Sequence, residues 1–119
     1  MTESDRRSPR RGDVFWVDFN PARGVEQAGR RPAVVVQNDR GNANSSYTVV
    51  AAISSALLSR KYPFTVLLQP GDANVSQACH VNCAQLITID QNRLERYIGS
   101  LGGALMLEID DALRYELDL

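Results

Sequence analysis

The sequence lacks a long apolar segment. Its longest apolar runs, such as AVVV and VVAAI, fall far short of the roughly 18 consecutive apolar residues that a membrane-spanning helix requires. The first residues, MTESDRRSPRR, contain no apolar stretch of the kind found in signal peptides. We therefore expect no association with a membrane and a cytoplasmic location.

Cysteine and histidine are scarce, with two cysteines and one histidine in 119 residues. If Cys79 and Cys83 lie on one strand, their Cα atoms are roughly 13 Å apart, well beyond the ~7 Å limit for a disulfide. His80 lies between them, but this C-H-x-x-C pattern lacks the second pair of ligands that a structural zinc site needs. We expect reduced, packed thiols, and nothing in the sequence implies a metal or another cofactor.

An excess of charge of one sign is also missing, because the net charge is −1. The distribution is nevertheless uneven. Residues 1–61 hold ten Lys and Arg against six Asp and Glu, giving +4, whereas residues 62–119 hold three against eight, giving −5. This asymmetry favours an anion-binding side. Four of the arginines lie within residues 1–11, however, where they could simply keep a frayed tail in water.

The length of 119 residues fits one domain with a single core. We expect a flexible polar tail over residues 1–10 and one domain over residues 11–119. β-Branched and aromatic runs separated by turn residues predict strands, at residues 13–19, 32–38, 46–54, 63–69 and 80–89. Apolar residues at helical spacing predict an amphipathic helix over residues 103–116, packed as a lid rather than free for a partner. The fold class is therefore mainly β, a small barrel or sandwich with a C-terminal helix.

The segment between the first two predicted strands has no periodicity. It contains GVEQAGRRP at residues 24–32, whose two glycines and basic pair are spaced almost as in a phosphate-binding loop. That interpretation fails because Lys and Ser/Thr are missing and because a strand, not a helix, follows. The segment still offers guanidinium and backbone N–H groups to an anion.

A family resemblance rests on several segments taken together, which are RRGDVFWVDFNPARGVEQAGRRPAVVVQND, TVVAAIS, YPFTV, TIDQNRL and the C-terminal amphipathic helix. They resemble the MazF/PemK/Kid toxins of bacterial toxin–antitoxin systems, from about Arg11 to Leu119. The most specific element is G-x-E-Q-x-G-x-R-P followed by a β-branched strand. The resemblance implies a CcdB/MazF-like SH3-like barrel with a C-terminal helix, homodimerisation, metal-free cleavage of single-stranded RNA (mRNA), and neutralisation by a cognate MazE-like antitoxin.

Arg31 is the first candidate for catalysis. Metal-free RNA cleavage uses the neighbouring 2′-OH as nucleophile, so the protein must supply a base, a proton donor and positive charge for the transition state. Arg31 precedes Pro32, which restricts its backbone to extended geometry, and its planar fork can hold two phosphate oxygens. A guanidinium does not release its proton near neutral pH, so we assign Arg31 to transition-state stabilisation.

Ser54 and Glu26 complete the predicted catalytic set. Ser54 ends VVAAIS, where the family usually carries Thr as its second catalytic residue. The hydroxyl is kept, but the β-branch that stiffens χ1 is lost, and the adjacent Ser55 could substitute. Glu26 is the only acid in the long loop and could act as the base, or it could simply pair with a neighbouring arginine.

Further residues are predicted to bind RNA through amide hydrogen bonds, charge or aromatic stacking. They are Gln27, Arg30, Phe19, Asn20, Asn38 and Gln85. Phe19 could instead belong to the core, and the two asparagines stand where turns favour Asn. Trp16 is expected in the core, because a large ring on a strand is usually buried.

Some positions depart from the family. Kid carries a His before its Glu-Gln pair and an Arg and an Asp on the late strand, where this chain has Val25, Asn82 and Ala84. The Kid acid and base assignment is therefore not transferred. Two rival hypotheses remain at this point, a non-catalytic gyrase inhibitor like CcdB and an RNA-binding barrel without turnover. The chain ends YELDL and lacks the C-terminal Trp-Gly segment associated with gyrase inhibition.

Overall fold

The computed structural model of the chain describes residues 8–19, 29–56, 58 and 60–119. Its strands are β1 (Asp13–Asp18), β2 (Arg30–Val35), β3 (Tyr47–Ser54), β4 (Thr65–Leu68), β5 (Cys79–Asp90) and β6 (Leu94–Ser100). Its helices are α1 (Asp39–Asn44), α2 (Gly103–Leu117) and the short 3₁₀ turns η2 (Asp72–Asn74) and η3 (Gln91–Arg93). Within the described ranges, no helix is both long and apolar enough to cross a membrane.

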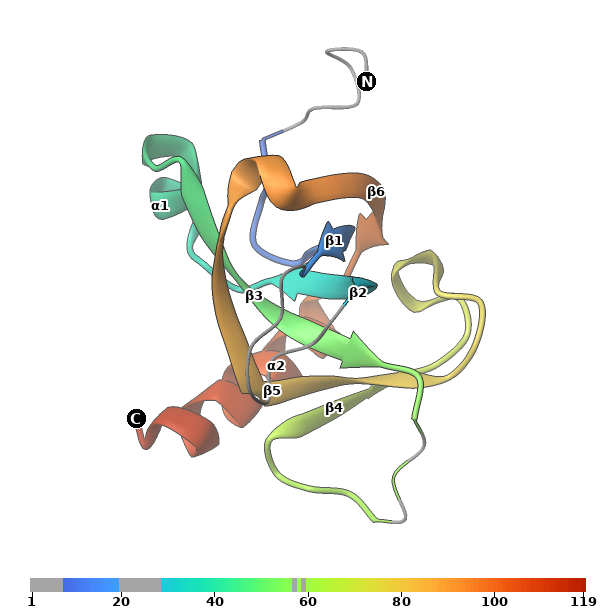
Figure 1. The fold of residues 1–119 in the computed structure, drawn as a ribbon. Helices are drawn as coiled ribbons and strands as arrows, with labels where there is room; N and C mark the ends of the chain where they lie inside the picture. Colours follow the sequence, from blue (N-terminus) through green and yellow to red (C-terminus); the bar gives the residue numbers. More distant parts are fainter. Residues whose placement is uncertain (1–7, 20–28, 57, 59) are drawn as a thin grey trace.

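The strands form one antiparallel sheet in the order β4-β5-β3-β2-β1-β6 (Figure 1). A mainly β fold with a C-terminal helix is thereby confirmed. The sheet curls as a small barrel does, but it is not closed, because the edge strands β4 and β6 are not paired with each other in the described part of the chain.

A sharp bend in β5 produces much of the curvature. Along β3, Ala51 is paired with Leu86 but the next residue, Ala52, is paired with Asn82. The extra residues on β5 form an irregularity of the bulge type, which bends a strand and increases its twist. Figure 1 shows β5 changing direction, so that its first half also pairs with β4.

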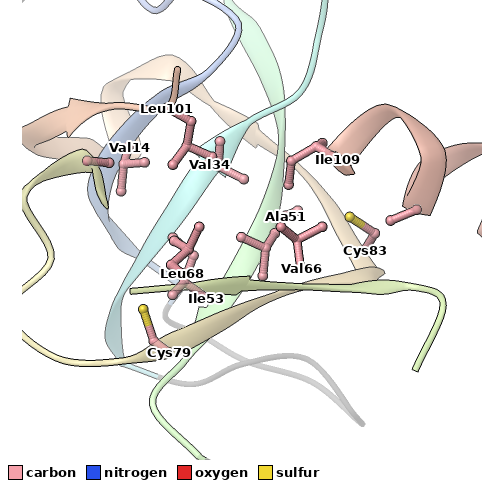
Figure 2. Packing of buried hydrophobic residues seen from close by; sticks show 13 residues of the cluster. Val14, Val34, Ala51, Ile53, Val66, Leu68, Cys79, Cys83, Leu101 and Ile109 are labelled. Atoms are coloured by element: carbon pink, nitrogen blue, oxygen red, sulfur yellow. The ribbon is translucent and has the colours of Figure 1, made fainter. Parts of the chain in front are cut away.

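Side chains alternate between the two faces of the sheet. The helix-side face carries Val14, Val34, Ala51 and Ile53, which pack with Ile109 of α2 in the larger buried cluster (Figure 2). The opposite face carries the second cluster, with Phe15, Val17, Ala33, Val35 and Val50 among its members. Two cores on the two sides of one sheet therefore hold each strand in register, because a slip of one residue would exchange its faces.

The sequence-based boundaries hold for most elements. The C-terminal helix begins at Gly103 as predicted and ends at Leu117, and its buried residues are Ile109 and Ala112. β6 was not predicted, and α1 was interpreted as a turn. α1 is short and starts at an asparagine cap, the side chain of Asn38 accepting a hydrogen bond from the Gly41 backbone N–H at 2.7 Å. Such a cap has the same local signal as a turn.

Both cysteines are free thiols and are buried, as expected from their spacing. Cys83 is fully buried in the helix-side cluster, and this burial raises the pKa of its thiol to about 11. Both thiols therefore belong to the packing of the sheet.

Gly99 of β6 lies directly against η2. A Cβ atom at this position would approach the Ala73 carbonyl oxygen to 2.7 Å, and the Asn74 side chain donates a hydrogen bond to the Ile98 carbonyl at 2.8 Å. Ala73 and Asn74 both have left-handed backbones. Only glycine allows this approach without displacing the turn.

We expect Gly99→Ala to lower the free energy of unfolding by about 1–3 kcal/mol, because the new methyl group overlaps backbone that is already strained. Urea denaturation of the purified variant measures the change. Gly103→Ala is the matched control, because a Cβ there meets nothing within 4 Å and alanine suits a helix start. Equal stability of both variants would show that η2 moves freely away from β6.

Candidate functional site

Arg31 is the second residue of β2 and faces away from the helix-side core. It is paired with Val17 on β1, whose side chain is fully buried on the face of the sheet that points away from α2. Directly opposite residues of an antiparallel pair share a face, so the Arg31 side chain leaves the sheet on the same side as Val17. The residue is half-buried.

The Nε atom of Arg31 is buried and has no hydrogen-bond partner among the described residues. An unsatisfied buried donor costs about 1–3 kcal/mol, and more where the group is charged. Such groups are rare in folded proteins, and each calls for a physical reason. An anionic ligand placed at this N–H would accept its hydrogen bond and supply the missing partner.

Ser54 lies beside Arg31 in the sheet. The paired residues of β2 and β3 end at Ala33 and Ala52. Alternation along each strand puts Arg31 on the face of Ala33 and Ser54 on the face of Ala52, so the two side chains share a face. Ser54 is paired in turn with His80 of β5. A row across four adjacent strands therefore carries Val17, Arg31, Ser54 and His80 on one face. The two described residues predicted to be catalytic are brought together by this row.

The Ser54 hydroxyl is itself held locally. The backbone N–H of Ala56 donates to Ser54 Oγ at 3.2 Å, and the residue is half-buried at the end of β3. Ser55 belongs to the other face, where it lines a pocket. By position in the sheet, Ser54 rather than Ser55 is the partner of Arg31.

The pocket on the helix-side face has a volume of about 640 Å³. Its lining combines an aromatic ring, aliphatic side chains, amides, hydroxyls and arginines. The aromatic, cationic and amide groups of the lining come from Trp16, Arg30, Arg96, Asn74 and Gln77, and Arg31 borders the pocket as well. No Asp or Glu occurs among the described lining residues. Its chemistry suits a flat, polar and anionic ligand.

Trp16 corrects an expectation. It was assigned to the core, yet 39% of it is exposed and it lines this pocket. Its neighbours on β1, from Val14 to Val17, are buried, so the exposure is local. The space between β1, η2 and β6 leaves the ring uncovered. Sequence alone could not reveal this, because a tryptophan on a strand gives the same signal whether or not a second element covers it.

Arg30 is held at the rim of the pocket. Its Nε donates to Glu95 Oε1 at 2.8 Å, and this hydrogen bond with the carboxylate raises the pKa of Arg30. The side chain remains 66% exposed. Arg30 thus stays a cation that is already partly neutralised by Glu95.

The other residues predicted to bind RNA lie in different environments. Phe19 is 6% exposed and packs in the second cluster, so burial explains it and it cannot stack on a base. Asn38 is the N-cap of α1, a local backbone role like the turn role that was the alternative to RNA binding. Gln85 is half-buried in the bent part of β5. Glu26, Gln27 and Asn20 lie outside the described residues.

Residues 10–117 match the model of the PemK-like, MazF-like toxin family of type II toxin–antitoxin systems. The chain belongs to this family. The family resemblance derived from GVEQAGRRP and the following strand is thus confirmed over almost the whole length of the domain.

Similar proteins agree in name and in fold. Endoribonuclease MazF9 of Mycobacterium tuberculosis is 40% identical over 116 residues, covering 92% of this chain and 97% of the relative. Endoribonuclease MazF of Staphylococcus epidermidis is 36% identical over 110 residues, covering 92% of both chains. A mycobacterial endoribonuclease solved in complex with its cognate antitoxin has a TM-score of 0.78 at 26% identity, covering 93% of this chain and 96% of that one.

The energetic state of Arg31 can be tested by stability alone. Arg31→Met removes a buried N–H without a partner and keeps most of the side-chain volume, so we expect the free energy of unfolding to rise by about 1 kcal/mol. Arg30→Met, which loses an exposed ion pair, should lower it by less than ~1 kcal/mol. Urea denaturation compares both variants with the wild type. A loss above ~1 kcal/mol in Arg31→Met would identify a structural arginine.

Proposed function

We propose that the protein is a sequence-specific, metal-independent endoribonuclease toxin that cleaves single-stranded mRNA in the cytoplasm and so inhibits translation and growth. The observation that carries the proposal is the half-buried Arg31, whose Nε has no hydrogen-bond partner in the described part of the chain and which shares a face of the sheet with the Ser54 hydroxyl. Family membership supports it, because close relatives are named endoribonucleases. The same relatives favour this function over gyrase inhibition.

The reaction follows from the substrate's own chemistry. The 2′-oxygen of a ribose attacks the adjacent phosphorus, the bond from phosphorus to the 5′-oxygen breaks, and the products are a 2′,3′-cyclic phosphate and a 5′-OH. Negative charge accumulates on the non-bridging oxygens in the transition state. Arg31 donates from Nε and its terminal nitrogens to these oxygens, and the Ser54 hydroxyl adds a hydrogen bond from the neighbouring strand.

Protons must move twice in this reaction. The 2′-OH loses one to a base, and the departing 5′-oxygen gains one. We propose Glu26 as the base, because it is the one carboxylate between the glycines of GVEQAG and therefore close in sequence to Arg31. A carboxylate accepts a proton in its ionised form.

The pocket extends the binding site beyond the phosphate. Trp16 offers an exposed ring on which an unpaired base can stack, while Arg96 and the amides of Asn74 and Gln77 can bond a base edge or a phosphate. Both sites adjoin the start of β2, since Arg30 lines the pocket and Arg31 leaves the other face. RNA passing over this strand end would place one nucleotide in the pocket and the scissile phosphate on Arg31.

Two protein partners are part of the proposal. A relative of similar fold has been solved with its cognate antitoxin, and we propose a MazE-like antitoxin for this chain. We also propose a homodimer. Large apolar side chains stay exposed on α2, with Leu107 at 66% and Tyr115 at 60%, and a second subunit would remove such surface from water.

Cleavage tests the proposal directly. Incubated in EDTA with a defined transcript, the wild type should cut single-stranded sites and leave a cyclic phosphate, whereas Arg31→Ala should cut about 100- to 1,000-fold more slowly. Primer extension maps the sites and their sequence. Arg30→Ala is the adjacent control and should lose less than ~10-fold, because this exposed arginine is already paired. Intact RNA with inhibited gyrase supercoiling, or undiminished cutting by Arg31→Ala, would contradict the assignment.

Trp16 is the only tryptophan in the chain, so its fluorescence reports on the pocket alone. We expect short 2′-O-methyl RNA spanning a mapped cut site, which lacks the nucleophile, to quench this fluorescence. Arg96→Ala should weaken binding by about 3- to 10-fold, since a charged contact is worth roughly 1 kcal/mol. A duplex of the same sequence is the control and should not quench. Binding of the labelled single strand with unchanged Trp16 emission would place the RNA elsewhere.

A further inference from the structure

His80 is the only histidine of the chain, and it lies in the row that contains Arg31 and Ser54. It is 8% exposed and stands directly opposite Ser54, on the neighbouring strand β5. Its Nδ1 is 2.9 Å from the carbonyl oxygen of Ala56. A carbonyl oxygen only accepts, so Nδ1 carries the proton and donates it in this hydrogen bond.

Ala56 connects this imidazole to the Ser54 hydroxyl. Its carbonyl accepts from His80, and its N–H donates to Ser54 Oγ. The two groups flank one Cα atom, so the histidine restrains the backbone that restrains the hydroxyl. The link also joins the end of β3 to β5 at the last residues of their pairing, where a strand end would otherwise fray.

The hydrogen bonds through Ala56 restrict a serine side chain that has little rigidity of its own. A threonine at position 54 would have a χ1 angle stiffened by its β-branch, whereas serine has three rotamers of similar energy. To donate to a phosphate oxygen beside Arg31, the hydroxyl must occupy one particular rotamer. In this chain the Ala56 N–H selects the rotamer, and the buried imidazole fixes the direction of that N–H.

We propose that His80 is a positioning residue that orders the Ser54 hydroxyl through the backbone of Ala56, in compensation for the missing β-branch. The inference rests on the proposed RNA cleavage at Arg31 and Ser54. It assigns His80 no contact with the substrate, in keeping with its burial. His80 acts on the rate of the chemical step, not on the affinity for RNA.

The test compares His80→Ala with His80→Asn, whose Nδ2 amide can donate from nearly the position of Nδ1. Single-turnover cleavage at saturating RNA should fall about 10-fold in His80→Ala, with KM within about twofold of the wild type, and should recover most of its rate in His80→Asn. Thermal unfolding of each variant ensures that folded protein is compared. A KM effect without a rate effect, or equal rates in wild type and His80→Ala, would overturn the inference.

The same substitution in a Ser54→Thr variant tests whether His80 acts through Ser54. If the histidine compensates for the missing β-branch, His80→Ala should slow a Ser54→Thr enzyme by less than about twofold, so that the two substitutions are not additive. Equal slowing in both backgrounds would reduce His80 to general packing and overturn the role. This comparison remains usable even if His80→Ala is less stable, because the same loss of packing occurs in both backgrounds.

The tautomer offers a readout that does not depend on activity. Imidazole ¹⁵N chemical shifts of the wild type should show a protonated Nδ1, and those of Ser54→Ala should show the same state, because the hydrogen bond to Ala56 remains. A neutral ring protonated only on Nε2 would overturn the link. Absence of RNA cleavage by the wild type, in contrast, would remove the proposed function and leave this hydrogen bond intact.

Discussion

The register of β2 between β1 and β3 decides which side chains reach the surface and on which side. Pairing of Arg31 with Val17, and by continuation with Ser54, sends the guanidinium to the face opposite the helix. A shift of one residue would turn Arg31 toward the helix-side core and move the valines of each core to the opposite face. The buried apolar clusters on the two faces thus specify the functional geometry as firmly as they specify the fold.

The stability of this strand register offsets the free-energy cost of burying the Nε of Arg31. A buried Nε without a partner opposes folding, and it persists because the surrounding valines and alanines hold the strand in place. Ground-state strain at a binding site is released when the ligand arrives, so the same free energy appears as affinity for an anion. Arg30, whose exposed guanidinium is already paired with Glu95, has no comparable energy to release. Two adjacent arginines of one motif therefore differ in exposure because their strand faces differ.

Much of the fold could be predicted from the sequence, because five strands and the C-terminal helix have clear periodic patterns. β6 escaped prediction since Glu95 and Arg96 interrupt its apolar alternation and its pairing with β1 is irregular. Motif and resemblance singled out Arg31 and Ser54 as candidates, but they did not single out Trp16, Arg96 or His80. The roles that we propose for these three residues depend on contacts between residues distant in sequence, such as the approach of η2 to β6 and the pairing of Ser54 with His80. No local pattern encodes those contacts.

Under the proposed mechanism, the serine at position 54 lacks the internal rigidity that a threonine would have. Threonine limits its hydroxyl by a covalent branch, while serine must obtain the same restriction from its surroundings. Here we propose that the restriction arises from Ser54 at the end of β3, Ala56 just beyond it and His80 on β5, linked by hydrogen bonds of 3.2 and 2.9 Å. Such a link holds only while β3 and β5 remain paired, so the order of the hydroxyl depends on the tertiary fold. If Ser54 acts as we propose, the sheet takes the place of a methyl group as the element that directs this side chain.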